Sequence, residues 1–319
     1  MADSDAADTG LSRTYDDAFA VTPAYRDRLP DTQNADASAF RGAPVRVDQV
    51  GIAGFSFGGT VARPDGLPPL SVELQADGTV PLPAGVRGIN MSRIPRCLLA
   101  HQANPWTPGG LKTPLEAIAA EVGAPGAQLT LTFRYPIAQP SLRSGLTGDQ
   151  YLTVRYAGRI DDAGTFRAWL VLDFIYSSAC PGSADLADHA AAERGAYAIP
   201  HSQRSLANLA VEIDPNGSFF PEDLHRHAVA ALKTETQVMV RREDEQAFAE
   251  LNGANPKFVE DAARLLFAQL DGDARIRDFA VACRHMESLH NHDAVARVRK
   301  IAGQPFSGDW LEPWRPAVC

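Results

Sequence analysis

The chain has few cysteines, no long hydrophobic run and no excess of positive charge. Its 319 residues include four cysteines, which form no C-x-x-C pair: Cys97, Cys180, Cys283 and Cys319. Cysteines spaced this widely favour reduced thiols over a disulfide framework, so we expect a cytoplasmic protein. No run of about 18 apolar residues occurs, which argues against a membrane span. The first residues are acidic and lack the charged and apolar regions of a signal peptide.

Charge and composition narrow the classes of partner. The chain carries 39 acidic and 30 basic side chains, for a net charge of −9, so we expect no nucleic-acid or membrane partner. A phosphorylated ligand would therefore need a local group of basic residues. Hydrophobic residues make up 45% of the chain, which suits a globular protein with a large core.

Two kinds of periodicity predict an α+β protein with antiparallel sheets. Apolar residues at every second position predict strands at 128–135, 151–156, 166–176, 205–213 and 277–283. Amphipathic spacing predicts helices at 113–122, 220–234 and 256–270. Glycines and prolines interrupt residues 44–110, where we predict loops and short strands. Strands in pairs, separated by pairs of helices, are typical of an antiparallel α+β architecture.

Glu287, His290 and His292 lie close together in the sequence and are the most informative set of potentially reactive side chains. The two histidines are two residues apart, so in an extended segment they lie on one face. Imidazoles and a carboxylate can bind a transition metal or transfer protons near neutral pH. Such a string is also common in ordinary polar loops, and the cluster alone does not decide between the two.

The string M-E-S-L-H-N-H-D-A at 286–294 resembles a signature of the type IB GTP cyclohydrolases, the FolE2 family. Other segments resemble that family in the same order: L-P-D-T-Q (29–33), V-D-Q-V-G-I (47–52), V-R-G-I-N-M-S-R (86–93), S-A-C-P-G-S (178–183), H-S-Q-R-S (201–205), T-E-T (234–236), V-R-R-E-D-E (240–245) and N-P-K-F-V-E-D (255–261). The ordered set extends over roughly residues 29–300. On these motifs the chain is identified as a divergent member of the family.

The resemblance implies a fold and an assembly. It implies two tunnelling-fold units in tandem, with antiparallel sheets and helices on one face, assembled as a homotetramer with sites at subunit interfaces. Residues 1–28 are rich in Asp and Ala, so we expect a flexible acidic tail there. The resemblance implies a first half at 29–165 and a second half at 166–319. The second half would carry most of the metal site.

The resemblance also implies a set of metal ligands. Cys180, His201 and Glu235 match the family's ligands for one divalent transition metal, which the donor types allow to be Zn²⁺, Mn²⁺ or Fe²⁺. Three protein ligands leave a coordination position for water, as in catalytic sites. Without the resemblance, a lone cysteine such as Cys180 is more often a small buried hydrophobic residue.

The remaining matched residues have implied roles in proton transfer and substrate binding. Glu287, His290 and His292 would transfer protons, and Glu250 would accept hydrogen bonds from the N1–H and amino group of guanine. Four arginines are candidate phosphate contacts, because the guanidinium group matches phosphate oxygens: Arg93, Arg204, Arg241 and Arg242. Taken singly, Glu250 and each arginine are more often solvated surface residues.

The implied reaction is the opening of the GTP imidazole ring at C8. Formate is released, and the ribose rearranges and recloses to give 7,8-dihydroneopterin triphosphate, a precursor of pterins and folate. A methanopterin-type relative, which makes a cyclic phosphate product with ferrous iron, is a close variant.

The chain departs from the family pattern near the predicted metal site. The family reads C-P-C-S-K where this chain reads C-P-G-S-A (180–184), and Asn90 replaces a histidine. The missing lysine and histidine could each have contacted the triphosphate, and each such charge-assisted contact is worth roughly 1.5–3 kcal/mol. Their loss leaves a second hypothesis open, in which the same fold and metal act on a different heterocyclic substrate.

The segment between Cys180 and His201 is also longer than in the family. Within it, four side chains could form a second metal cluster: Asp185, Asp188, His189 and Glu193. An exposed, alanine-rich helix explains the same residues more simply, and we favour it.

Two further interpretations remain open. The G-F-S-F-G string at 54–58 matches the serine-hydrolase pattern, but the prolines at 64, 68 and 69 oppose the helix that must follow the serine. A protein that binds a purine or pterin without turnover is the other alternative. It has no need of the open metal site that Cys180, His201 and Glu235 would form.

Overall fold

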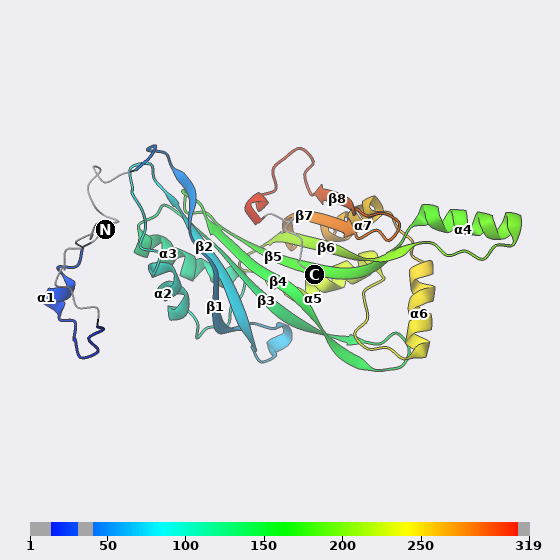
Figure 1. Ribbon diagram of the computed structural model, residues 1–319, viewed down its shortest axis with the longest axis horizontal. Coiled ribbons are helices and arrows are strands. Elements are labelled where there is room, and N and C mark those ends of the chain that lie inside the picture. Colours follow the sequence, from blue (N-terminus) through cyan, green and yellow to red (C-terminus); the bar gives the residue numbers. More distant parts are fainter. Residues whose placement is uncertain (1–13, 31–40, 312–319) are drawn as a thin grey trace, which may run out of the picture.

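The computed structural model describes residues 14–30 and 41–311. Its centre is an eight-stranded sheet in which each strand pairs antiparallel with its neighbour in the chain (Figure 1). The strands are β1 (Val47–Val61), β2 (Leu70–Leu82), β3 (Ala127–Pro140), β4 (Thr147–Ile160), β5 (Phe166–Ala179), β6 (Ser202–Ile213), β7 (Ile276–His285) and β8 (Ala294–Arg299). The predicted α+β class with antiparallel pairing is confirmed.

Helices cover one face of this sheet. They are α2 (Arg93–Ala100) and α3 (Lys112–Val122) over the first four strands, and α5 (Pro221–Leu232) and α7 (Val259–Asp271) over the last four. The predicted helices at 113–122, 220–234 and 256–270 correspond to α3, α5 and α7. From β1 to the turn at 161–165, the strands and α-helices follow the order β-β-α-α-β-β. The described elements after the turn follow the same order, with two additional helices inserted.

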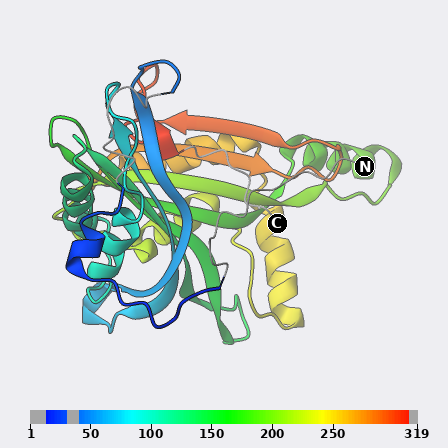
Figure 2. The same cartoon turned by 60° about the vertical axis from the view of Figure 1, so that its left-hand side comes forward.

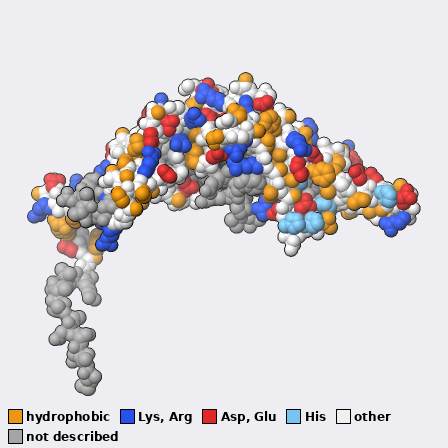
Figure 3. Space-filling view, turned by 90° about the horizontal axis from the view of Figure 1, so that it is seen from above, with side chains coloured by type: hydrophobic (Ala, Val, Ile, Leu, Met, Phe, Trp, Pro, Cys, Tyr) orange, Lys and Arg blue, Asp and Glu red, His pale blue; other side chains and the backbone are white. Residues whose placement is uncertain are grey.

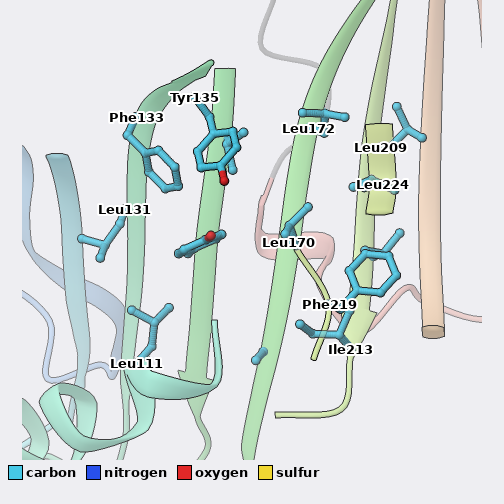
Figure 4. Close-up of a cluster of buried hydrophobic side chains, with 14 of the residues drawn as sticks. Leu111, Leu131, Phe133, Tyr135, Leu170, Leu172, Leu209, Ile213, Phe219 and Leu224 are labelled. Carbon is cyan, nitrogen blue, oxygen red and sulfur yellow. The ribbon is translucent and has the colours of Figure 1, made fainter. Parts of the chain in front are cut away.

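The main core lies between the helices and the sheet. Residues at every second position of β3 and β5 point into it, including Leu131, Phe133 and Leu170, and Leu224 of α5 packs in the same cluster (Figure 4). Each such fully buried side chain contributes about 1.5–3 kcal/mol relative to an exposed one. The core therefore holds the sheet and its helices as one unit.

On the opposite face the described residues form no α-helix, and the short 3-10 helix Asp309–Leu311 packs there. Trp169 of β5 packs there against Phe306 and Trp310, with the two indole rings 5.6 Å apart. The molecule curves into an arch (Figure 3). Two further helices, α4 (Pro181–Arg194) and α6 (Arg242–Gly253), lie at the end of the sheet remote from α2 and α3 (Figures 1 and 2).

The prediction of loops and short strands for 44–110 was wrong. β1 and β2 are 15 and 13 residues long, and α2 follows them. The glycines do not break these strands but allow them to approach closely. A Cβ atom on Gly51 would lie 2.0 Å from the carbonyl oxygen of Gly78, and Gly54 takes a φ of +71° at a bulge.

Two other expectations concern the ends of the chain and the serine motif. Residues 1–13 of the predicted tail lie outside the described residues. Residues 14–30 are exposed and contain the short helix α1 (Pro23–Arg26).

Ser56 lies inside β1, paired with Gln75 of β2, so the strand-to-helix turn of a serine hydrolase is absent at this position. No helix among the described residues is long and apolar enough to cross a membrane.

Candidate functional site

Cys180 lies where β5 ends and α4 begins. It is the N-cap residue of α4, its side chain is partly buried, and its backbone N–H donates a 3.1 Å hydrogen bond to the carbonyl oxygen of His201. Ser183, in the first turn of α4, accepts a hydrogen bond from the His201 backbone N–H at 3.2 Å. These two hydrogen bonds hold Cys180 and His201 side by side where β5 meets α4.

Glu287 reaches His201 from the loop between β7 and β8. The Nδ1 atom of His201 lies 3.3 Å from Oε2 of Glu287 and 3.1 Å from Oε1 of Gln203. The side chains of His201 and Glu287 are 16% and 14% exposed, so water screens their interaction little. Ser288 holds the loop in place by donating to the carbonyl oxygen of Ser202 at 3.3 Å. The structure thus brings Cys180, His201 and Glu287 to one end of the sheet.

His290 and His292 lie further along the same loop and are exposed. Their rings stack with centroids 4.8 Å apart and an angle of 13° between the ring planes, so both lie on one side of the loop. Exposed histidine side chains are visible on the α4 side of the molecule (Figure 3). The role of His290 and His292 in proton transfer stays a prediction.

Glu235 is held by His225, a residue outside the predicted site. The backbone of Glu235 pairs with Tyr176, four residues before Cys180, and its buried carboxylate lies 2.6 Å from Nε2 of His225 on α5. His225 and His227 are two residues apart on α5, and in a helix such side chains point in different directions, so their spacing did not identify His225. Among residues 14–30 and 41–311, no three His, Cys, Asp or Glu side chains lie close enough together to hold a metal ion.

The donor types at this end of the sheet nevertheless fit a transition metal. Cys180 supplies a thiol, His201 an imidazole, and Glu235 a carboxylate, which together suit zinc and accept manganese or ferrous iron. The thiol and imidazole residues are neighbours through their backbone hydrogen bond. The Oε1 atom of Glu235 contacts His225, which leaves Oε2 as the oxygen that could face a metal ion.

A buried polar layer lies under these residues, on the helix-covered side of the sheet. Gln203 donates to the Ser178 hydroxyl at 2.7 Å, and Ser178 is 2.8 Å from the hydroxyl of Ser205. Because Gln203 also contacts His201, this chain of hydrogen bonds fixes the orientation of the imidazole.

His285 and Lys257 are two buried titratable groups in this layer. His285 is 2% exposed, and its Nε2 atom lies 2.9 Å from the hydroxyl oxygen of Tyr176. Burial and the nearby ammonium group of Lys257 lower the pKa of His285 to about 4. Burial also lowers the pKa of Lys257, to about 8, and its Nζ donates to Thr234.

We expect stability to fall as the solution is acidified below the ordinary histidine pKa. His285 has a pKa of about 4 in the folded chain, against roughly 6.5 when unfolded, so the unfolded state binds more protons between these values. The stabilisation lost between pH 6.5 and pH 4 amounts to about 3 kcal/mol from this residue. Urea unfolding at several pH values measures it. A His285→Gln variant should show a flatter profile, and an unchanged slope would contradict this assignment.

α6 carries Glu250 and begins beside two of the predicted phosphate contacts. Arg241 and Arg242 are exposed at its N-terminus. Glu250 is on its exposed side, where its Oε2 atom lies 3.0 Å from the guanidinium of Arg143. Arg143 is 107 positions away in the chain, and no sequence motif points to this contact.

The other two predicted phosphate contacts are separated in space. Arg204 is exposed on β6, next to Gln203. Arg93 starts α2 at the opposite end of the sheet, where its guanidinium contacts the carbonyl oxygen of Glu121 (Figure 1). Within one chain Arg93 therefore lies far from Cys180.

The inserted segment forms the predicted exposed helix. α4 spans it, with Ala187 as its buried residue, and it projects from the end of the sheet (Figure 1). The four candidate ligands of this helix do not form a metal-binding group in the described part of the chain.

Fold and site together define a class: an α+β protein with a thiol, an imidazole and carboxylates at one end of an antiparallel sheet. A model of the family described as type I GTP cyclohydrolase folE2 matches residues 29–296. The GTP cyclohydrolase FolE2 of Cereibacter sphaeroides is 45% identical over 304 residues, covering 95% of this chain and 83% of the relative. That of Ruegeria pomeroyi is 44% identical, covering 95% and 82%. The chain therefore belongs to the type I GTP cyclohydrolase FolE2 family.

Among solved structures, the uricase of Arthrobacter globiformis aligns with a TM-score of 0.47 and 7% identity, over 81% of this chain and 95% of that one. The element order of the present chain is that of tunnelling-fold units in tandem, as the resemblance implied.

Proposed function

We propose that this protein hydrolyses GTP at C8 of the purine, releases formate and forms 7,8-dihydroneopterin triphosphate. The observation that carries the proposal is the family match over residues 29–296, supported by relatives at 44–45% identity along nearly the whole chain. The position of Cys180, His201 and Glu287 at one end of the sheet supports it independently. Such an enzyme would act in the cytoplasm and supply pterin or folate synthesis.

In this proposal Cys180, His201 and Glu235 hold one divalent metal ion, Zn²⁺, Mn²⁺ or Fe²⁺. The bound metal would polarise a water molecule and lower its pKa, which is the chemistry that C8 attack requires. Glu287, in contact with His201, would accept or return the protons of the reaction, together with His290 and His292.

Glu250 and the arginines would bind the nucleotide. A carboxylate on an exposed helix face can accept two hydrogen bonds from the guanine edge, and Arg204, Arg241 and Arg242 are exposed at the same end of the molecule. Arg93 lies at the other end of the sheet. It could join this site from a second subunit if the chains assemble as a homotetramer with interface sites, built from halves at 29–165 and 166–319.

A second candidate keeps the fold and metal but changes the heterocycle. It is favoured by the residues that follow Cys180, since Gly182 and Ala184 replace the family's cysteine and lysine, and by the longer segment that forms α4. A shape change at this helix could admit a differently substituted ring.

A turnover assay separates the two candidates. Protein purified without oxygen is loaded with Zn²⁺, Mn²⁺ or Fe²⁺ and mixed with GTP, and the oxidised, dephosphorylated product is measured as neopterin fluorescence. Metal-dependent neopterin would support the cyclohydrolase and rank the metals. A protein that holds metal but makes no neopterin would exclude GTP as the substrate and favour the second candidate.

A further inference from the structure

Arg143 lies against the carboxylate that is proposed to bind guanine. It is in the loop that joins β3 to β4, and its Nη2 atom donates a 3.0 Å hydrogen bond to Oε2 of Glu250 on α6. In Figure 1 the tip of this hairpin lies beside the end of α6. The pair therefore forms a surface made by elements that are remote in sequence.

The backbone of this loop is fixed, although the Arg143 side chain is exposed. The buried carboxylate of Asp244 accepts hydrogen bonds from the backbone N–H groups of Arg143 at 2.7 Å and Ser144 at 2.8 Å. The same carboxylate accepts the Arg241 N–H at 2.8 Å, so the loop and the start of α6 share one anchor. Ser141 adds a 2.7 Å hydrogen bond to the carbonyl oxygen of Met239. The guanidinium is thus presented from a rigid position.

The ion pair of Arg143 and Glu250 is exposed to solvent in the single chain. The side chains of Arg143 and Glu250 are 59% and 56% exposed. A pair this accessible to water contributes little to stability, so the protein has no strong folding requirement for it. The fold therefore does not depend on this pair, and both side chains can be contacted from solvent.

We propose that Arg143 donates a hydrogen bond to O6 of guanine and so acts as a specificity-determining residue. This inference rests on the proposed function, in which Glu250 accepts the N1–H and the 2-amino group. On the guanine edge, O6 follows directly after N1–H. A guanidinium nitrogen carries two N–H groups, so Nη2 can keep one on Glu250 while Arg143 donates another to O6. Arg143 as donor then faces the acceptor O6, and Glu250 as acceptor faces the donors N1–H and the 2-amino group.

The test compares nucleotides that differ at one edge position. Dissociation constants are measured by calorimetry on the full-length, metal-free protein, so that no turnover occurs. GTP is compared with 6-thio-GTP, which keeps both donors but has a weaker acceptor at position 6. It is also compared with ITP, which lacks the 2-amino group. We expect Arg143→Ala to weaken GTP binding about tenfold, to leave 6-thio-GTP within about twofold, and to leave the discrimination against ITP unchanged.

Arg264→Ala is the matched control, since Arg264 is an exposed arginine of α7 paired with Asp261. Its binding constants should equal those of the unmodified chain. If Arg143→Ala weakens GTP and 6-thio-GTP equally, the arginine contacts phosphate or acts structurally, and the inference is wrong while the proposed function stands. If the unmodified chain binds ITP as tightly as GTP, or binds no GTP, the role of Glu250 fails and the inference fails with it.

Discussion

We expect replacement of Cys180 with alanine to lower metal-dependent turnover by about a thousandfold or more and to lower the metal content of the purified protein. The thiol is one of three proposed ligands, and its loss removes the softest donor from a site that already depends on few groups. Several kcal/mol of transition-state stabilisation depend on the metal, and each 1.36 kcal/mol is a factor of ten in rate. Neopterin formation and metal analysis by mass spectrometry measure the two effects.

The control for this substitution is Cys97→Ala. Cys97 is a buried thiol on α2, at the end of the sheet remote from Cys180 (Figure 1). It should keep its metal, and its activity should stay within about threefold of the unmodified chain, because the change removes a small core side chain outside the site. A Cys180→Ala protein that retains both metal and turnover would show that Cys180 is not a ligand.

Much of the fold is predictable because its signals are local. β5 and β6 alternate or run continuously apolar because they are central strands buried on both faces, and α5 and α7 show the stripe of a helix on a sheet. Prediction fails where a residue type is needed for a contact with a part of the chain that is distant in sequence. The glycines of β1 permit close pairing with β2, although they look like breakers in the sequence. α6 was missed because it buries only Asp244 and Ala247 and has almost no apolar stripe.

The site was less predictable, because its contacts join residues that are distant in the chain. The family resemblance named Cys180, His201 and Glu287 as separate motifs, and only the folded sheet shows that His201 and Glu287 touch across 86 positions. His225 and Arg143 carry no motif at all, and each was found through a contact to a predicted carboxylate. A sequence motif indicates the chemistry that a side chain can perform, whereas the fold determines which other side chain it contacts.

The contact between His201 and Glu287 leads to the second large effect, which concerns proton transfer. Replacing Glu287 with glutamine keeps the size of the side chain but removes its negative charge and its ability to accept a proton. We expect kcat to fall by about 10²–10⁴, the range typical for loss of a general acid or base, while KM for GTP changes little. Steady-state kinetics at several pH values measure both, and one limb of the pH profile of kcat should disappear.

Two comparisons decide whether this loss reflects proton transfer or damage to the site. Glu116→Gln, on the exposed surface of α3 at the other end of the sheet, is the matched control and should leave kcat and its pH profile unchanged. Glu287→Asp keeps the charge but shortens the reach to His201, so it should retain more activity than the glutamine variant. If Glu287→Gln loses metal, the 3.3 Å contact serves to orient His201 as a ligand. If it keeps metal and full kcat, the proton is handled elsewhere, and the exposed His290 and His292 become the residues to test.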